Sequence, residues 1–193
     1  WLGLISHEYF HLWNVKRLRP FALGPFDYDH ENYTHMLWVA EGVTSYYDDL
    51  VLARTGLMLP DSYLSVVASN ISTIASTPAD KIDAVTESSF DAWIKYYRSN
   101  ENSNNATTNY YSKGSVLALL LDIEIISASN GQKTLDDLMK VLYKKYYKEL
   151  KRGFTEAEFQ KETEAIVGKK LDDFFQNYVQ GTKTIDYNYY FDK

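Results

Sequence analysis

Two histidines and a glutamate near the start of the chain have the types and spacing of a zinc site. His7, Glu8 and His11 form the pattern His-Glu-x-x-His. On an α-helix, residues four apart lie on the same face, so both imidazoles can point at one metal ion. Zinc lowers the pKa of a bound water to roughly 7, and the Glu8 carboxylate could then take a proton from that water. The pattern predicts hydrolytic chemistry with one zinc ion per chain.

A catalytic zinc ion needs a third protein ligand. Glu41 is a single acid within an apolar stretch whose hydrophobic residues recur at helical spacing. Since a buried carboxylate is costly unless it binds a metal or a cation, Glu41 is the expected third ligand. Glu31 is the rival, because 19 residues separate it from His11, but its polar surroundings predict a loop. The other alternative is an ion pair between Glu41 and one of the nearby cations Lys16, Arg17 and Arg19.

Longer segments around these residues carry a family resemblance. They are HEYFHLWN at 7–14 and WVAEGVTSYY at 38–47, joined by a connector that contains KRLRP at 16–20 and PFDY at 25–28. A further segment, YYSKGSVL at 110–117, contains a Tyr-x-Lys-Gly motif that is similar to one in the larger zinc aminopeptidases. Together the segments resemble the glycyl aminopeptidase family of gluzincin zinc metallopeptidases.

The resemblance implies a mainly α fold, the helical lobe of a thermolysin-like (gluzincin) catalytic domain, which takes up residues 1–193 as one domain fragment. It implies a zinc-dependent peptidase that releases N-terminal glycine, or alanine, from peptides. It also implies partners outside these residues: a preceding β-rich lobe, which binds the substrate backbone and its free amino group, and a following PDZ domain. A periplasmic or secreted location is expected from the same resemblance.

Tyr111 is the tyrosine before x-Lys-Gly, so the resemblance gives it the role of donating a hydrogen bond to the tetrahedral oxyanion. A phenol stays protonated at neutral pH and can donate to a developing negative charge. The alternative is a packing role, because the chain has 17 tyrosines and most of them must be amphipathic packing residues. From the residues alone, the packing role is the default.

Composition narrows the function further. A chain of 193 residues can bury one substantial core or two small lobes. The net charge of −6 argues against a general nucleic-acid binder, and the lysines of 140–152 alternate with apolar residues as on a solvated helix face. The absence of cysteine excludes disulfides and thiolate metal sites. The sequence contains no run of 18 apolar residues, so no membrane span is predicted.

The hydrophobic pattern predicts helices almost throughout. Residues 2–14, which carry the histidines, are apolar nearly all round and are therefore expected to form a buried helix. Thr155 and Glu158 have capping-box spacing, and the alternating tail 184–191 predicts a short strand. The polar segment 99–106 is expected to be a mobile loop. The remaining helices are expected at 33–55, 60–76, 108–129, 134–150, 155–167 and 171–178.

Several polar residues near the motifs have two interpretations. His30 could line a cleft, as could His35, although exposed positions are expected for both. Arg17 and Arg19 could bind a substrate carboxylate, but structural salt bridges are expected. Asp48 or Asp49 could accept a hydrogen bond from a zinc-binding histidine, with surface exposure as the expectation. These residues are candidates rather than members of the predicted site.

Three hypotheses therefore compete. The first is a zinc metallopeptidase with His7, His11 and Glu41 as ligands and with Glu8 and Tyr111 as catalytic residues. The second is a zinc-binding helical module that is catalytically silent as an isolated fragment and serves in interaction. The third is a metal-free helical domain, which leaves two histidines and a glutamate buried without partners, at a cost in free energy.

Overall fold

The structure is a computed structural model that describes residues 1–193. It is built from helices, with two isolated β-bridges and no strand, so the expected mainly α fold is confirmed. The α-helices are α1 (Leu2–Phe10), α2 (Val43–Arg54), α3 (Pro60–Ser76), α4 (Val85–Phe90), α5 (Ser103–Ala106), α6 (Tyr110–Ala128), α7 (Leu135–Leu142), α8 (Glu156–Val167), α9 (Asp172–Phe174) and α10 (Tyr187–Phe191). Three π-helical segments (Trp38–Gly42, Tyr143–Glu149 and Phe175–Val179) and four short 3₁₀ turns (Phe21–Leu23, Pro78–Lys81, Asp91–Trp93 and Tyr96–Arg98) complete the chain.

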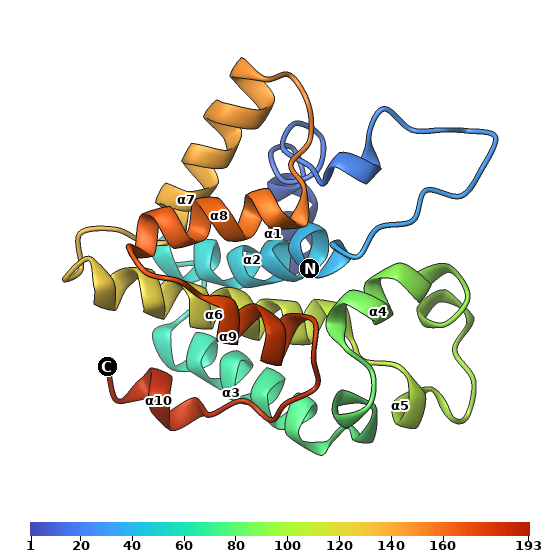
Figure 1. The fold of residues 1–193 in the computed structure, drawn as a ribbon. Coiled ribbons are helices and arrows are strands. Elements are labelled where there is room, and N and C mark those ends of the chain that lie inside the picture. The colour runs from blue at the N-terminus through green and yellow to red at the C-terminus, as the bar shows by residue number, and fades with distance from the viewer.

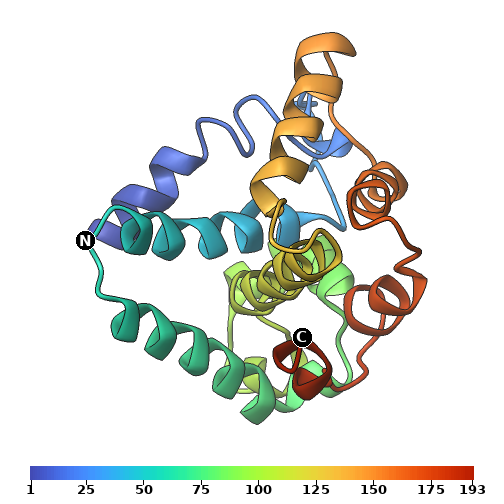
Figure 2. The same cartoon turned by 90° about the vertical axis from the view of Figure 1, so that its left-hand side faces the viewer.

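Helix α6 lies at the centre of the molecule. It packs against α2 on one side and α3 on another, while α7, α8 and α10 cover its C-terminal half (Figures 1 and 2). Because α6 has neighbours on several sides, Lys113, Asp122 and Glu124 on this helix are buried together with most of its leucines and isoleucines. Each of these charged side chains therefore needs a polar partner inside the protein.

The crossing between α6 and the helix that carries Glu41 is unusually close. A methyl group on Gly42 would overlap the Cα of Gly114, and one on Gly114 would lie 2.6 Å from the carbonyl oxygen of Trp38. Only glycine at both positions allows the two backbones to touch. The turn at the crossing, Trp38–Gly42, is π-helical, and such turns often occur at functional sites.

Helix α1 differs from the expectation. It ends at Phe10 rather than at residue 14, and none of its residues is fully buried. Figure 2 shows it lying along α2, which is its main neighbour, and Phe10 stacks on Tyr47 there with ring centroids 4.6 Å apart. Leu4 and Ile5 are exposed on its other faces. The prediction of a buried helix is therefore wrong, because α2 covers only one face of α1.

The other predicted helices are found, with three local differences. The second helix begins near residue 37 instead of 33, and the helices expected to end near 150 and 178 finish in π-helical turns. The capping box of α8 is confirmed, since Thr155 and Glu158 accept hydrogen bonds from each other's backbone nitrogens. No helix is both long and apolar enough to cross a lipid bilayer.

The C-terminal segment forms a helix, α10, where a strand was predicted. Asp186 caps this helix by accepting a hydrogen bond from the backbone nitrogen of Tyr189. Ile185 and Tyr190 are the buried residues of the segment, whereas Tyr187 and Tyr189 are more exposed. The alternation of large residues misled the prediction, because tyrosines on both faces of a short helix can imitate the period of a strand.

Candidate metal centre

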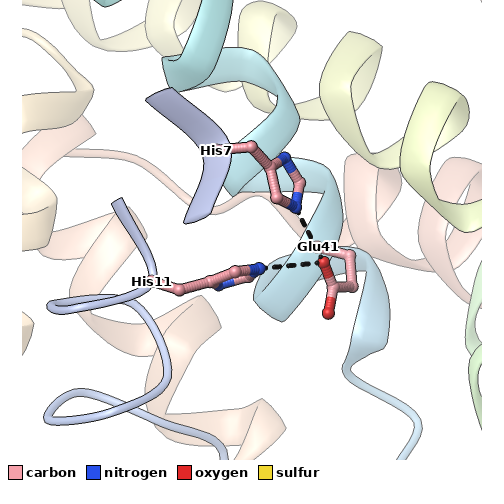
Figure 3. Close-up of side chains that lie close together, drawn as sticks. All are labelled: His7, His11 and Glu41. Atoms are coloured by element: carbon pink, nitrogen blue, oxygen red, sulfur yellow. Dashed lines mark hydrogen bonds and ion pairs between the residues drawn. The ribbon is translucent and has the colours of Figure 1, made fainter. Parts of the chain in front are cut away.

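His7, His11 and Glu41 converge on one point between α1 and the π-helical turn. His7 lies within α1, His11 caps its C-terminus and Glu41 comes from the neighbouring turn. The Nε2 atoms of the two histidines lie 3.1 Å and 3.2 Å from the same Glu41 carboxylate oxygen, as Figure 3 shows. One ligand atom from each residue lies within 4.8 Å of the other two.

These three side chains fit a zinc ion. Bonds of about 2.0–2.1 Å to a tetrahedral ion place neighbouring ligand atoms about 3.3 Å apart. The observed separations of 3.1 Å and 3.2 Å are close to that value. Two imidazoles and one carboxylate also form a donor set of catalytic zinc sites, which keep a further position open.

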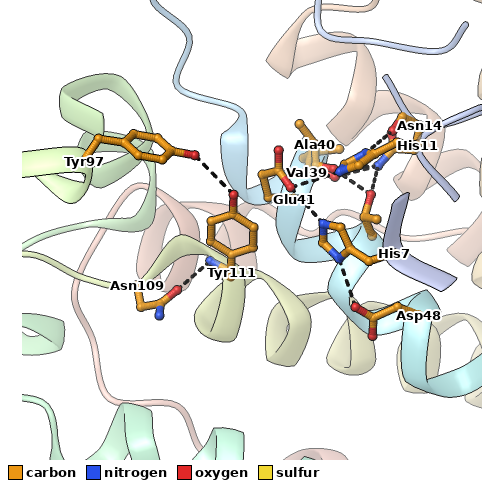
Figure 4. A network of polar contacts seen from close by, with 11 residues as sticks. His7, His11, Asn14, Val39, Ala40, Glu41, Asp48, Tyr97, Asn109 and Tyr111 are labelled. Carbon is orange, nitrogen blue, oxygen red and sulfur yellow. Dashed lines mark hydrogen bonds and ion pairs between the residues drawn. The ribbon is translucent and has the colours of Figure 1, made fainter. Parts of the chain in front are cut away.

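The far side of each imidazole is held by a hydrogen bond. The Nδ1 atom of His7 lies 2.9 Å from Asp48 Oδ2, and that of His11 lies 2.8 Å from the backbone oxygen of Asn14 (Figure 4). Such contacts fix the ring orientation and direct the Nε2 lone pair toward a metal. Asp48 is therefore part of the site, and the expectation that it lies exposed on the surface is wrong.

The mutual contacts change the acidity of these groups in the metal-free chain. Hydrogen bonds to Asp48 and then to Glu41 raise the pKa of His7 to about 9. Burial raises the pKa of Glu41, but the contacts with His11 and His7 together outweigh it and lower the pKa to about 2. Burial lowers the pKa of His11, yet its contacts with Glu41 and Asn14 raise the pKa overall. Glu41 is thus ionised, as a metal ligand must be.

Asn14 joins the two segments of the site, and sequence analysis missed it. Its buried side-chain amide donates to the backbone oxygens of Val39 and Ala40 at 2.9 Å and 3.2 Å, and to the Thr44 hydroxyl at 3.1 Å. These bonds tie the turn after α1 to the turn that carries Glu41. The available signal was a polar residue three positions after His11 in an apolar stretch.

The two expected catalytic residues take different positions. Glu8 is exposed on α1 and takes no part in the contacts that join the three candidate ligands. Tyr111 lies at the start of α6, with its ring centroid 6.1 Å from that of His7. Its hydroxyl lies 3.4 Å from the hydroxyl of Tyr97, as Figure 4 shows. Burial, then Tyr97 and Glu41, raise the pKa of Tyr111, so its hydroxyl keeps its proton.

The Tyr-x-Lys-Gly motif divides into three structural roles. Tyr111 faces the site, and Gly114 allows the close crossing with Gly42. Lys113 is only 1% exposed, and its ammonium lies 2.5 Å from a carboxylate oxygen of Asp80. The lysine therefore anchors α6 to the turn at Pro78–Lys81 and does not reach the metal centre.

The remaining candidates lie outside the cluster. Glu31 is in the exposed connector and is not grouped with the histidines, and His35 stacks on Phe90. His30 is exposed, as expected, and pairs with Asp27, but it also lines the cleft that Glu41 borders. The salt bridges expected for two arginines are not formed. Arg17 donates to a backbone oxygen, and both arginines line a basic cleft: Arg17, Arg19, Lys148, Lys151 and Arg152.

Comparison with known proteins identifies the family of the chain. Residues 1–117, which include every candidate ligand and catalytic residue, match the family model described as M61 glycyl aminopeptidase. The chain belongs to the M61 glycyl aminopeptidase family. The resemblance noted from the sequence is thereby confirmed, and the chain is assigned to a family of peptidases.

The fold of this M61 chain is also found in a solved structure. The chain is similar to the crystal structure of an aminopeptidase N family protein from Idiomarina loihiensis, with 34% sequence identity and a TM-score of 0.93. The similarity covers 99% of this chain but 32% of that one, so the chain spans about a third of its relative. A search of curated proteins finds no match.

Proposed function

We propose that this chain carries the metal centre of a zinc-dependent aminopeptidase that releases N-terminal glycine, or alanine, from peptides. One observation carries the proposal: two imidazoles and a carboxylate converge at ligand distance, and Asp48 and Asn14 hold the far sides of both rings. The three ligand candidates are partly buried, and rings held from behind in this way are typical of metal-binding histidines. Membership in the M61 family supports the reaction and the substrate class.

In this proposal His7, His11 and Glu41 hold the zinc ion. When bound, zinc supplies a Lewis acid that polarises the scissile carbonyl and acidifies a water molecule. The Glu8 carboxylate takes a proton from the attacking water and passes it to the leaving amine. The Tyr111 hydroxyl donates a hydrogen bond to the carbonyl oxygen as negative charge develops there. Its raised pKa supports this role, because only the protonated phenol can donate.

Metal content of the purified chain is the first test, measured by inductively coupled plasma mass spectrometry. About one zinc per chain is expected in the wild type and in Glu31→Ala, and much less in Glu41→Ala. Glu31→Ala is the matched control, because Glu31 is a nearby acid that lies outside the cluster. Zinc retained in Glu41→Ala would contradict the ligand set.

Peptidase turnover, measured on the protein as its gene encodes it (the naturally expressed protein), tests the catalytic roles. Glu8→Gln is expected to keep its zinc and to lose about a hundredfold or more in kcat. Tyr111→Phe is expected to lower kcat by roughly a hundredfold with a small change in KM, since the hydrogen bond strengthens in the transition state. Aminoacyl substrates with glycine, alanine and leucine at the N-terminus test the specificity. Normal turnover in Glu8→Gln would contradict the general-base role.

A second candidate function is a zinc-binding module without catalysis. The observation in its favour is the position of Glu8, whose exposed side chain takes no part in the contacts among the ligands. It predicts stoichiometric zinc with no peptidase activity in the naturally expressed protein. Release of N-terminal glycine by that protein would eliminate this alternative.

A further inference from the structure

A large apolar cavity opens beside the metal centre. Its volume is about 760 Å³, and Glu41 forms part of its wall. Other walls come from the connector after α1, from the turns at Asp91–Trp93 and Tyr96–Arg98, and from the start of α6. The apolar and aromatic residues that line it include Leu23, Phe26, Leu37, Trp93, Tyr97 and Tyr110. A cavity of this size and composition is typical of ligand-binding sites.

The connector that forms one wall is braced by its own hydrogen bonds. The Asn32 amide accepts from the backbone nitrogen of Asp27 at 3.0 Å and donates to the backbone oxygens of Asp27 and His30 at 2.7 Å and 3.2 Å. This wall therefore has a defined shape. No lysine or arginine lines the cavity, whereas the carboxylates of Asp27 and Glu41 do. The one histidine in the wall, His30, already pairs with Asp27, so an acidic side chain would find no free cation there and is disfavoured.

One polar group in the wall lacks a partner. Tyr110 is completely buried, and its hydroxyl makes no hydrogen bond of normal geometry within the chain, with Tyr97 as its polar neighbour. Leaving a buried hydroxyl unpaired is costly, so such a group calls for a partner from outside the chain. Since Tyr110 also lines the cavity, a ligand in the cavity can supply that partner. A peptide offers a carbonyl oxygen at every residue for a phenol to donate to.

We propose that this cavity binds a bulky apolar or aromatic side chain of the residue next to the scissile bond, and that the Tyr110 hydroxyl donates to a backbone carbonyl of the same peptide. The inference rests on the proposed peptidase function. If the released residue is glycine, which has no side chain, the bulky residue is the one that follows it. The chain would then select peptides by their second residue as well as by their first.

The first test compares peptides on the naturally expressed protein. Peptides with glycine first and phenylalanine, leucine, alanine or glutamate second, and a matched set varied at the first position, are assayed for kcat/KM. At one of the two positions, phenylalanine or leucine should exceed alanine by roughly tenfold or more and glutamate by a larger factor. Equal values at both positions, or a preference for glutamate, would overturn the proposal.

A pair of neighbouring variants localises the effect. Trp93 lines the cavity, whereas Ile94 lies next to it in sequence, is similarly exposed and is absent from the wall. Trp93→Ala should reduce the preference for phenylalanine over alanine several-fold, and Ile94→Ala should leave it unchanged. Because both side chains are more than half exposed, neither substitution threatens folding. Equal behaviour of the two variants would overturn the assignment of this cavity.

Binding without turnover separates this inference from the proposed function. N-acetyl-phenylalanine amide and N-acetyl-glutamate are observed by saturation-transfer NMR with the zinc-stripped, naturally expressed protein. We expect saturation of the phenylalanine ring protons, weakened in Trp93→Ala and retained in Ile94→Ala, and little for glutamate. This result can hold even if Glu8→Gln shows that the proposed mechanism is wrong. If the zinc-loaded wild-type protein is active but its zinc-stripped form gives no phenylalanine signal, the cavity proposal alone is overturned.

Tyr110→Phe tests the unpaired hydroxyl. Its removal should leave the melting temperature unchanged or raised, since the buried group has no partner in the free protein. The same variant should lower kcat/KM for the phenylalanine peptide roughly tenfold. A residue with only a packing role would show unchanged kinetics, because phenylalanine preserves the packed ring. Unchanged kcat/KM for the phenylalanine peptide would therefore overturn the assignment of Tyr110.

Discussion

Gly42 and Gly114 meet in backbone contact where the π-helical turn crosses α6. Glu41 precedes the first glycine, and Tyr111 lies one helical turn before the second, on the same side of α6. The closeness of the crossing therefore determines how near the Tyr111 hydroxyl lies to the metal centre. The Tyr-x-Lys-Gly motif, which the sequence analysis interprets as catalytic, is thus also a packing motif.

Gly114→Ala should disturb stability and the metal centre together. The added methyl would lie 2.6 Å from the carbonyl oxygen of Trp38, so the helices must separate. We expect a loss of about 2 kcal/mol or more in the free energy of unfolding, measured by urea denaturation, and weaker zinc binding. Gly3→Ala is the control, because Gly3 lies in α1 with its nearest neighbour 3.9 Å away, and alanine favours a helix there. Wild-type stability in Gly114→Ala would contradict the close crossing.

Asp48→Asn should weaken zinc binding without removing a ligand. The carboxylate of Asp48 holds Nδ1 of His7, and loss of such a contact typically reduces metal affinity ten- to a hundredfold. Affinity is measured by competition with a chromophoric chelator. Asp49→Asn changes the adjacent acid, which makes no contact with His7, and should bind zinc like the wild type. Equal losses in the two variants would point to a general charge effect and against a specific contact.

The sequence predicted the helices and the candidate ligands because both depend on short-range patterns. His7 and His11 are one helical turn apart, and Glu41 stands alone in an apolar stretch, so chemical type and period were enough to select them. Asp48 was harder to choose. It lies two turns after Glu41, and only the packing of α1 on α2 decides that it faces His7 rather than solvent.

The predictions that failed depend on contacts between distant segments, which the pattern of a single segment does not specify. The exposed faces of α1 could not be predicted, because burial depends on which neighbours cover a helix. The π-helical turn at Trp38–Gly42 lies where the chain crosses α6, about seventy residues later in the sequence, so its surroundings are not local. Asn14 bonds to two backbone oxygens of that same turn, a contact that no local spacing specifies.

The buried ion pair between Lys113 and Asp80 should be costly to break. Asp80→Asn leaves an ammonium that is only 1% exposed without its counter-charge, so we expect a loss of about 3 kcal/mol in the free energy of unfolding. The double variant Lys113→Met with Asp80→Leu should recover much of that loss, since apolar side chains can replace a buried pair. Glu149→Gln, in an exposed pair with Lys144, is the control and should leave stability nearly unchanged. Urea denaturation measures all three.

Zinc binding should release protons, because the metal and a proton compete for His7. In the metal-free chain the pKa of His7 is raised to about 9 by Asp48 and then Glu41, so at pH 7.5 the ring is protonated. That proton stabilises the metal-free fold fully below about pH 6.5, and its contribution is lost as the pH rises through 9. A metal needs the unprotonated Nε2, so the proton must leave when zinc binds.

The apparent zinc affinity should therefore rise with pH, by about tenfold per unit between pH 7 and 9 for one released proton, and level off above 9. Calorimetry in two buffers of different ionisation enthalpy should give at least about one proton released per zinc at pH 7.5. In Asp48→Asn the plateau should begin at lower pH, because the largest cause of the raised pKa has been removed. A pH-independent affinity would mean that the His7 imidazole is already neutral in the metal-free chain, and that Asp48 accepts a hydrogen bond from the single N–H of that neutral ring.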